Sequence, residues 1–190
     1  MALIQTITTV HACVFSGLER LLNGWFLGLA ARFVFAGVLL LYFLGSFFTK
    51  VGTGVAGFFS VQDGAYFQIL PTVMERFEYS TANIPFIPYD LIVFSGTYAE
   101  FLLPILIVVG LFTRLAALGM IVFVLVQTYV DIAFHGADEK TTGALFDRFS
   151  DAVISDQRTL WVFVLLYLTI KGAGAISLDG LLSRRARSAA

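Results

Sequence analysis

Cysteine, histidine and charged residues are scarce in this chain of 190 residues. Cys13 is the only cysteine, so the chain has no internal disulfide and no thiolate metal cluster. It contains no CxxC or P-loop motif, and its apolar stretches hold no paired histidines to ligate haem. The net charge of −1 argues against nucleic acid as a partner. The chain therefore lacks the side chains with which a redox enzyme would ligate a cofactor of its own.

Basic residues are also missing from the first dozen positions, so the n-region of a signal peptide is not visible. The apolar residues that follow recur at helical spacing, at Val10, Val14, Leu18, Leu21, Leu22, Trp25 and Phe26. This pattern predicts an N-terminal interfacial helix within residues 1–28. It is amphipathic, with Trp25 at headgroup level, and is expected to stay on the mature protein.

Hydrophobic residues, by contrast, are abundant. They make up 58% of the chain, and the mean hydropathy is +0.88, whereas soluble domains are usually about 45–50% apolar. Four apolar runs, 29–49, 91–111, 115–134 and 160–176, approach the ~20 residues that span a bilayer. We therefore expect an all-α fold in which residues 29–185 form an antiparallel bundle of four transmembrane helices.

The distribution of Lys and Arg predicts the orientation. One side of the bundle receives Arg20, Arg32, Arg114, Lys171, Arg184, Arg185 and Arg187. The other side receives Lys50, Arg76, Lys140, Arg148 and Arg158 among many acids. The positive-inside rule then places both termini in the cytoplasm, with 186–190 as a basic tail end. We interpret Arg184–Arg187 as a topology anchor rather than a lipid-recognition site.

The outer loops are long, 51–90 and 135–157, and their aromatic residues need a surface to pack on. We expect them to pack together as a cap on the membrane. Within them, 64–77 is predicted as a short helix interrupted at Pro71, 83–89 as an extended segment, and 141–154 as an amphipathic surface helix.

Glu100 is the most unusual residue, because it lies near the middle of the second apolar run. A charge at that depth is costly, so it faces a protein interior or a water pocket. Pro104 has no N–H for the carbonyl of Glu100, which adds a second polar group at the same level. Two readings remain open: a functional carboxyl, or a packing carboxyl that is hydrogen-bonded across helices.

Counting residues into each run places four polar side chains near mid-bilayer, one from each span: Tyr42, Glu100, Gln127 and Tyr167. If they converge, they form a polar cluster able to bind a quinone headgroup or relay protons. Alternatively, the tyrosines face lipid or the polar groups satisfy one another. Arg32 and Lys50 lie at opposite ends of the first span, and neither is expected to reach Glu100. Glu100 is then expected to be protonated.

A second polar stripe follows the third span, where Gln127, Asp131 and His135 share one helical face. A carboxylate and an imidazole can bind a metal or move protons. A surface ion pair or a helix-end contact is the competing reading. Near the other end of the bundle, Asp179 is expected to cap a helix or to pair with Arg114.

Several of these motifs resemble the DoxX family of small bacterial membrane proteins. The similar segments are TYAEFLL at 97–103, VGLFTRLAA at 109–117, GAGAISLDG at 172–180, GVAGF at 54–58, and Lys50. The resemblance implies a four-helix protein of the bacterial inner membrane, often linked to redox chemistry. The family is named for a subunit of a thiosulfate:quinone oxidoreductase. Some members associate with thiol-stress proteins, and many have no defined activity.

The sequence thus supports three hypotheses about function. In the first, the chain is a quinone-interacting subunit with no covalently bound cofactor. Glu100 transfers protons there, Tyr42, Gln127 and Tyr167 complete the quinone pocket, and other membrane or redox subunits supply the remaining chemistry. In the second, it is a non-catalytic scaffold of a larger membrane complex. The third, a small transporter, rests on Glu100 alone.

Overall fold

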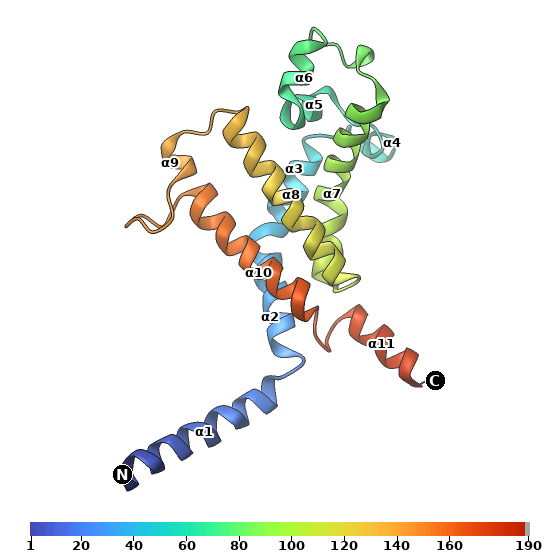
Figure 1. The fold of residues 1–190 in the computed structure, drawn as a ribbon. Helices are drawn as coiled ribbons and strands as arrows, with labels where there is room; N and C mark the ends of the chain where they lie inside the picture. Colours follow the sequence, from blue (N-terminus) through green and yellow to red (C-terminus); the bar gives the residue numbers. More distant parts are fainter. Residues whose placement is uncertain (189–190) are drawn as a thin grey trace.

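The computed structural model describes residues 1–188, and these residues form helices, turns and loops without a strand (Figure 1). The helices, in chain order, are α1 (Ala2–Leu22), α2 (Phe26–Phe35), α3 (Leu41–Phe48), α4 (Gly54–Phe58), α5 (Asp63–Ile69), α6 (Pro71–Arg76), α7 (Leu91–Val109), α8 (Thr113–Ala133), α9 (Glu139–Thr142), α10 (Arg158–Lys171) and α11 (Leu178–Ser188). Several of them are joined by short helical segments of other types. Three are π-helical, η1 (Ala36–Leu40), η3 (Phe86–Asp90) and η4 (Val153–Gln157), and one is a 3-10 helix, η2 (Thr81–Asn83).

Four helical stretches are long and apolar enough to cross a membrane: Phe26–Phe48, Phe86–Val109, Thr113–Ala133 and Val153–Lys171. The all-α bundle of four spanning helices is therefore confirmed. The last span starts and ends earlier than the sequence suggested, because η4 continues directly into α10 and Gly172, with φ +78°, stops the helix.

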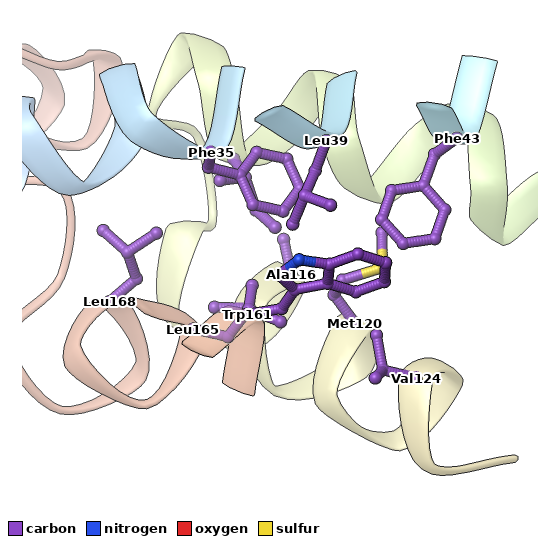
Figure 2. Packing of buried hydrophobic residues seen from close by; sticks show 11 residues of the cluster. Phe35, Leu39, Phe43, Ala116, Met120, Val124, Trp161, Leu165 and Leu168 are labelled. Carbon is purple, nitrogen blue, oxygen red and sulfur yellow. The ribbon is translucent and has the colours of Figure 1, made fainter. Parts of the chain in front are cut away.

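Packing follows the chain order. α8 lies between α7 and α10, while the first span contacts α10 through α2 and α7 through α3 (Figure 1). Figure 2 shows the buried cluster between them: Phe35, Leu39 and Phe43 from the first span meet Ala116, Met120 and Val124 of α8 and Trp161, Leu165 and Leu168 of α10. The bundle core is thus an apolar layer, and the polar groups lie on either side of it.

α1 extends away from the bundle, and its apolar stripe is exposed (Figure 1). Gly24, with φ +82°, makes the bend that separates α1 from α2. Gly28 follows on α2, and a Cβ there would lie 2.6 Å from the backbone of Ala173. The predicted helix is confirmed, and its location in the membrane surface stays a prediction.

The first outer loop folds on a small core of its own: Ala65, Tyr66, Met74, Ile84 and Val93. As predicted, the helical stretch is interrupted at Pro71, where α6 begins after the end of α5. The Tyr66 hydroxyl donates a 3.0 Å hydrogen bond to Asp90, which ties α5 to the segment that leads into α7. Burial and this carboxylate together raise the pKa of Tyr66 to about 12.

The second outer loop corrects a prediction. Helix is present only at α9 and η4, and residues 143–152 are irregular, so the amphipathic helix predicted over 141–154 is wrong. Asp138 caps α9 by accepting from the N–H of Thr141, and Gly143, with φ +63°, ends it after one turn. The hydrogen bond between His135 Nε2 and the carbonyl of Gln68, 2.9 Å, links the two loops. Their packing onto the membrane stays a prediction.

Residues 52–57 have the spacing GxGxxG, so the interpretation of the sequence as having no such motif is wrong. In a dinucleotide-binding loop this spacing follows a strand and opens a long helix. Here it forms the one-turn helix α4, and a Cβ on Gly57 would lie 2.3 Å from the carbonyl carbon of Gly52. The glycines serve this close backbone approach.

We predict that both termini lie on the cytoplasmic side. In a Cys13→Ser background, a cysteine at Ser188 should be protected from a membrane-impermeant maleimide in intact cells, and a cysteine at Ser150 should react. Both positions are exposed in the structure, so access to the label depends on the membrane alone. Labelling of both from the same side would overturn the topology.

Candidate functional site

A buried ion pair joins the first span to α7. Lys50 Nζ lies 2.8 Å from Oε2 and 3.1 Å from Oε1 of Glu100, and both side chains are nearly inaccessible. Ser46 completes the group, because its Oγ lies 2.6 Å from Lys50 Nζ and donates to Glu100 Oε1 at 3.2 Å. The carboxylate of Glu100 therefore has a cation and a hydroxyl as partners.

This pair overturns the expectation that Lys50 stays out of reach of Glu100. Had the outer ends of the two spans been level, nine residues of α7, about 14 Å of helix, would have separated them. Instead, the Phe47 ring packs against Tyr98 and Phe101, with centroids 5.8 and 4.9 Å apart. The end of α3 therefore lies level with the middle of α7. The Lys50 side chain also turns back toward Ser46, so Glu100 is not isolated and has a cation beside it.

The ion pair lines a cavity of about 760 Å³ between α3, α5, α7 and α8. Its other polar lining comes from Ser46, Gln68, Ser95, Gln127, Asp131 and His135, and the remainder is mostly apolar. Gly96 lies in the same wall, where a Cβ would lie 3.3 Å from Ile69. This small residue lets α5 close the outer end of the cavity.

Two more predicted site residues meet here. Gln127 Nε2 donates a 2.8 Å hydrogen bond to the hydroxyl of Tyr42, while Gln127 Oε1 is buried and has no hydrogen-bond partner among residues 1–188. Tyr42 also packs on Trp161, with ring centroids 5.5 Å apart. The structure thus brings Glu100 and Gln127 to one cavity and places Tyr42 directly behind Gln127.

Tyr167 lies elsewhere. It is partly buried against the apolar core, four residues before α10 ends, and it does not line this cavity. The fourth span starts and ends earlier than predicted, so Tyr167 lies near its C-terminal end rather than at its middle. Trp161 occupies the level where the sequence placed Tyr167.

Asp131 and His135 have separate partners. Asp131 forms an ion pair with Arg158, whose other amino group donates to Thr128 Oγ1 at 2.8 Å. His135 contacts Gln68, as described above. Within residues 1–188, no group of three or more His, Cys, Asp or Glu side chains is placed to hold a metal ion. The ion-pair reading of Asp131 is confirmed, with Arg158 as its partner.

The two remaining family-like motifs meet at the opposite end of the bundle. Asp179 accepts hydrogen bonds from the N–H groups of Phe112 and Thr113, at 2.8 and 2.9 Å, and so caps the start of α8. Its own N–H donates to the carbonyl of Gly110 at 2.8 Å. The capping reading of Asp179 is confirmed. Asp179, in the first turn of α11, therefore holds the tight α7–α8 turn, in which Phe112 adopts a left-handed conformation with φ +48°.

Sequence reasoning missed Lys50, Ser46 and Arg158 as members of these networks. The available signal was their spacing: Ser46 and Lys50 stand at i and i+4, so they share a helix face. The aliphatic stem of a lysine can also lie along apolar surface, so its ammonium can reach a group about one helical turn away. What the sequence did not contain was the axial offset between the helices.

Four apolar helices of membrane-spanning length, packed on a shared apolar core, define a small multi-pass helical membrane protein. A family model for DoxX matches residues 27–136, more than half of the chain, so the protein belongs to the DoxX family. No curated protein and no solved structure matches the chain.

Proposed function

We propose that the cavity between α7 and α8 binds the ring of a membrane quinone, and that the Lys50–Glu100 pair exchanges protons with it. A partner redox subunit supplies or accepts the electrons, because within residues 1–188 no group of side chains is placed to hold a metal ion and Cys13 has no second thiol to pair with. The observation that carries the proposal is a cavity whose inner wall holds a buried ion pair and whose rim is apolar.

The rim supports entry from the lipid. Leu91, Ile92, Val122 and Val126 line the cavity and are 44–55% exposed on the outer surfaces of α7 and α8. Because these surfaces belong to membrane-spanning helices, an apolar ring with a long tail can enter sideways while its tail remains in the bilayer. A water-soluble substrate would meet an apolar barrier at the same rim.

The inner wall supplies the groups that quinone chemistry requires. Reduction of a quinone takes two electrons and two protons and converts both carbonyl oxygens into hydroxyls. The Lys50 ammonium donates hydrogen bonds, the Glu100 carboxylate accepts them, and Gln127 Oε1 is an acceptor without a partner among residues 1–188. The site can therefore interact with the oxidised and the reduced ring.

Binding is tested with decylubiquinone and the purified protein in nanodiscs. Ala99→Phe places a large ring in the cavity wall, and Gln127→Leu removes the unpartnered acceptor, so both should weaken binding at least tenfold. Tyr42→Phe and Tyr167→Phe form a matched pair that removes one hydroxyl each. We expect weaker binding only for Tyr42→Phe, because its hydroxyl holds Gln127. Equal binding by Ala99→Phe and the parent protein would refute the quinone site.

The proton role is tested separately with Glu100→Gln, which keeps shape and polarity but cannot exchange a proton at this position. Loss of quinone-coupled activity in native membranes, with quinone binding and assembly intact, supports the role. Normal activity in Glu100→Gln, with misassembly only in Glu100→Leu, favours the scaffold. That second candidate has its own supporting observation, since Ser46 and Lys50 already satisfy both carboxylate oxygens of Glu100.

A further inference from the structure

We propose a second binding site, at the end of the bundle that carries the C-terminus, for the phosphate group of an anionic phospholipid. A cavity of about 690 Å³ opens there between the α7–α8 turn, the loop after α10, and α11. It lies on the far side of the apolar core from the quinone cavity, and no residue lines both. The proposal therefore stands independently of the proposed redox function.

The cavity gathers cations from three elements that are distant in sequence. Arg114 comes from the start of α8, Lys171 from the end of α10, and Arg184 and Arg187 from α11. None of the four forms an ion pair with another residue in the range 1–188. The one acid in the lining, Asp179, is held by the backbone N–H groups of the α8 cap. A phosphate group would supply the missing counter-charge.

The wall of this cavity fixes the direction of Arg114. A Cβ on Gly172 would lie 3.3 Å from Arg114 Nε, so the side chain lies against the backbone of the loop after α10. Gly172 has φ +78°, a conformation in which glycine is favoured. Arg114 is exposed, and its side chain lies beside the loop after α10, where it lines the cavity.

The surroundings favour a lipid over a free phosphate ion. The cavity lies where α7 and α10 end and α8 begins, the level at which headgroups meet spanning helices. Phe112 and Leu115 belong to the same lining and are 65% and 70% exposed. Arginines for the phosphate and apolar side chains for the acyl chains therefore stand next to each other. The sequence alone assigned Arg184–Arg187 to topology, whereas two of these three arginines line the cavity with Arg114 and Lys171.

The test uses the full-length protein in dodecyl maltoside, titrated with dihexanoyl phosphatidylglycerol and followed by native mass spectrometry. We expect saturable binding, and weaker binding of the zwitterionic dihexanoyl phosphatidylcholine. Arg184→Gln and Arg114→Gln should each weaken phosphatidylglycerol binding about fivefold, the effect of one cation near an anionic headgroup. Arg185→Gln is the matched control, since it removes the same charge from α11 at a position that does not line the cavity.

Three outcomes would overturn the proposal. Equal weakening by Arg185→Gln would show general attraction to a basic tail, and equal binding of the two lipids would remove the role of charge. Full displacement by inorganic phosphate, at the concentration at which phosphatidylglycerol itself saturates, would assign the site to a free anion. Unchanged thermal unfolding of Arg184→Gln, whose side chain is exposed, confirms that loss of binding is not loss of fold.

Discussion

Replacing Glu100 with leucine is expected to destabilise the bundle by about 3–5 kcal/mol, the usual cost of removing one partner of a buried ion pair. The Lys50 ammonium would remain in a nearly inaccessible position with only Ser46 as a partner. Lys50→Met should cost a similar amount, because it leaves the carboxylate of Glu100 without its cation. The free energy of unfolding is measured by SDS titration in mixed micelles.

The double variant Lys50→Met/Glu100→Leu distinguishes an ion pair from two independent contributions. Because replacing a whole buried pair with apolar residues is often neutral or stabilising, its free energy of unfolding should return close to that of the parent. Glu19→Leu, on the exposed surface of α1, is the control and should stay within about 0.5 kcal/mol. Additive losses in the double variant would mean that Lys50 and Glu100 do not act as a pair.

Replacing Arg32 with methionine is the second change with a large expected effect, a loss of about 3 kcal/mol from two hydrogen bonds to a charged group. Arg32 is buried, and its guanidinium donates to the carbonyl of Val108, at 2.8 Å, and to that of Ile176. The first carbonyl belongs to the last turn of α7 and the second to the loop before α11. Arg32 therefore ties three segments together.

Arg32→Lys is the informative companion, measured in the same SDS titration. It keeps the charge, but a lysine lacks the planar fork that reaches two carbonyls in different directions. We expect it to recover less than half of the loss. Full recovery by lysine would show that charge alone is needed at this position. Arg20→Met, on exposed α1, should have no measurable effect.

Several features follow from local sequence, and the structure confirms them. Composition and run length determine four spanning helices, because ~20 apolar residues suffice for a helix that crosses a bilayer. Pro71 breaks a helix and Gly24 bends the chain through their own backbone restrictions. These inferences succeed because each depends on a few neighbouring residues.

The irregular 143–152 segment shows where local reasoning fails. Its spacing of apolar residues allowed a helix, but Gly143 and Phe146 have positive φ angles, and Phe146 and Phe149 are exposed. Without a surface beneath it in this chain, an amphipathic pattern contributes little to helix formation. An amphipathic pattern of apolar residues therefore permits a helix here but does not by itself produce one.

Composition and the lengths of the apolar runs are enough to predict the membrane bundle, its spanning helices and a polar residue in each span. Which of these residues meet depends on how the helices pack against one another. Glu100 pairs with Lys50 because α3 ends level with the middle of α7, and Tyr167 lies away from the cavity because no residue of α10 lines it. The physical reason is that axial offset and rotation between helices are set by side-chain packing across the whole bundle. The composition and residue spacing of a single helix determine neither the offset nor the rotation.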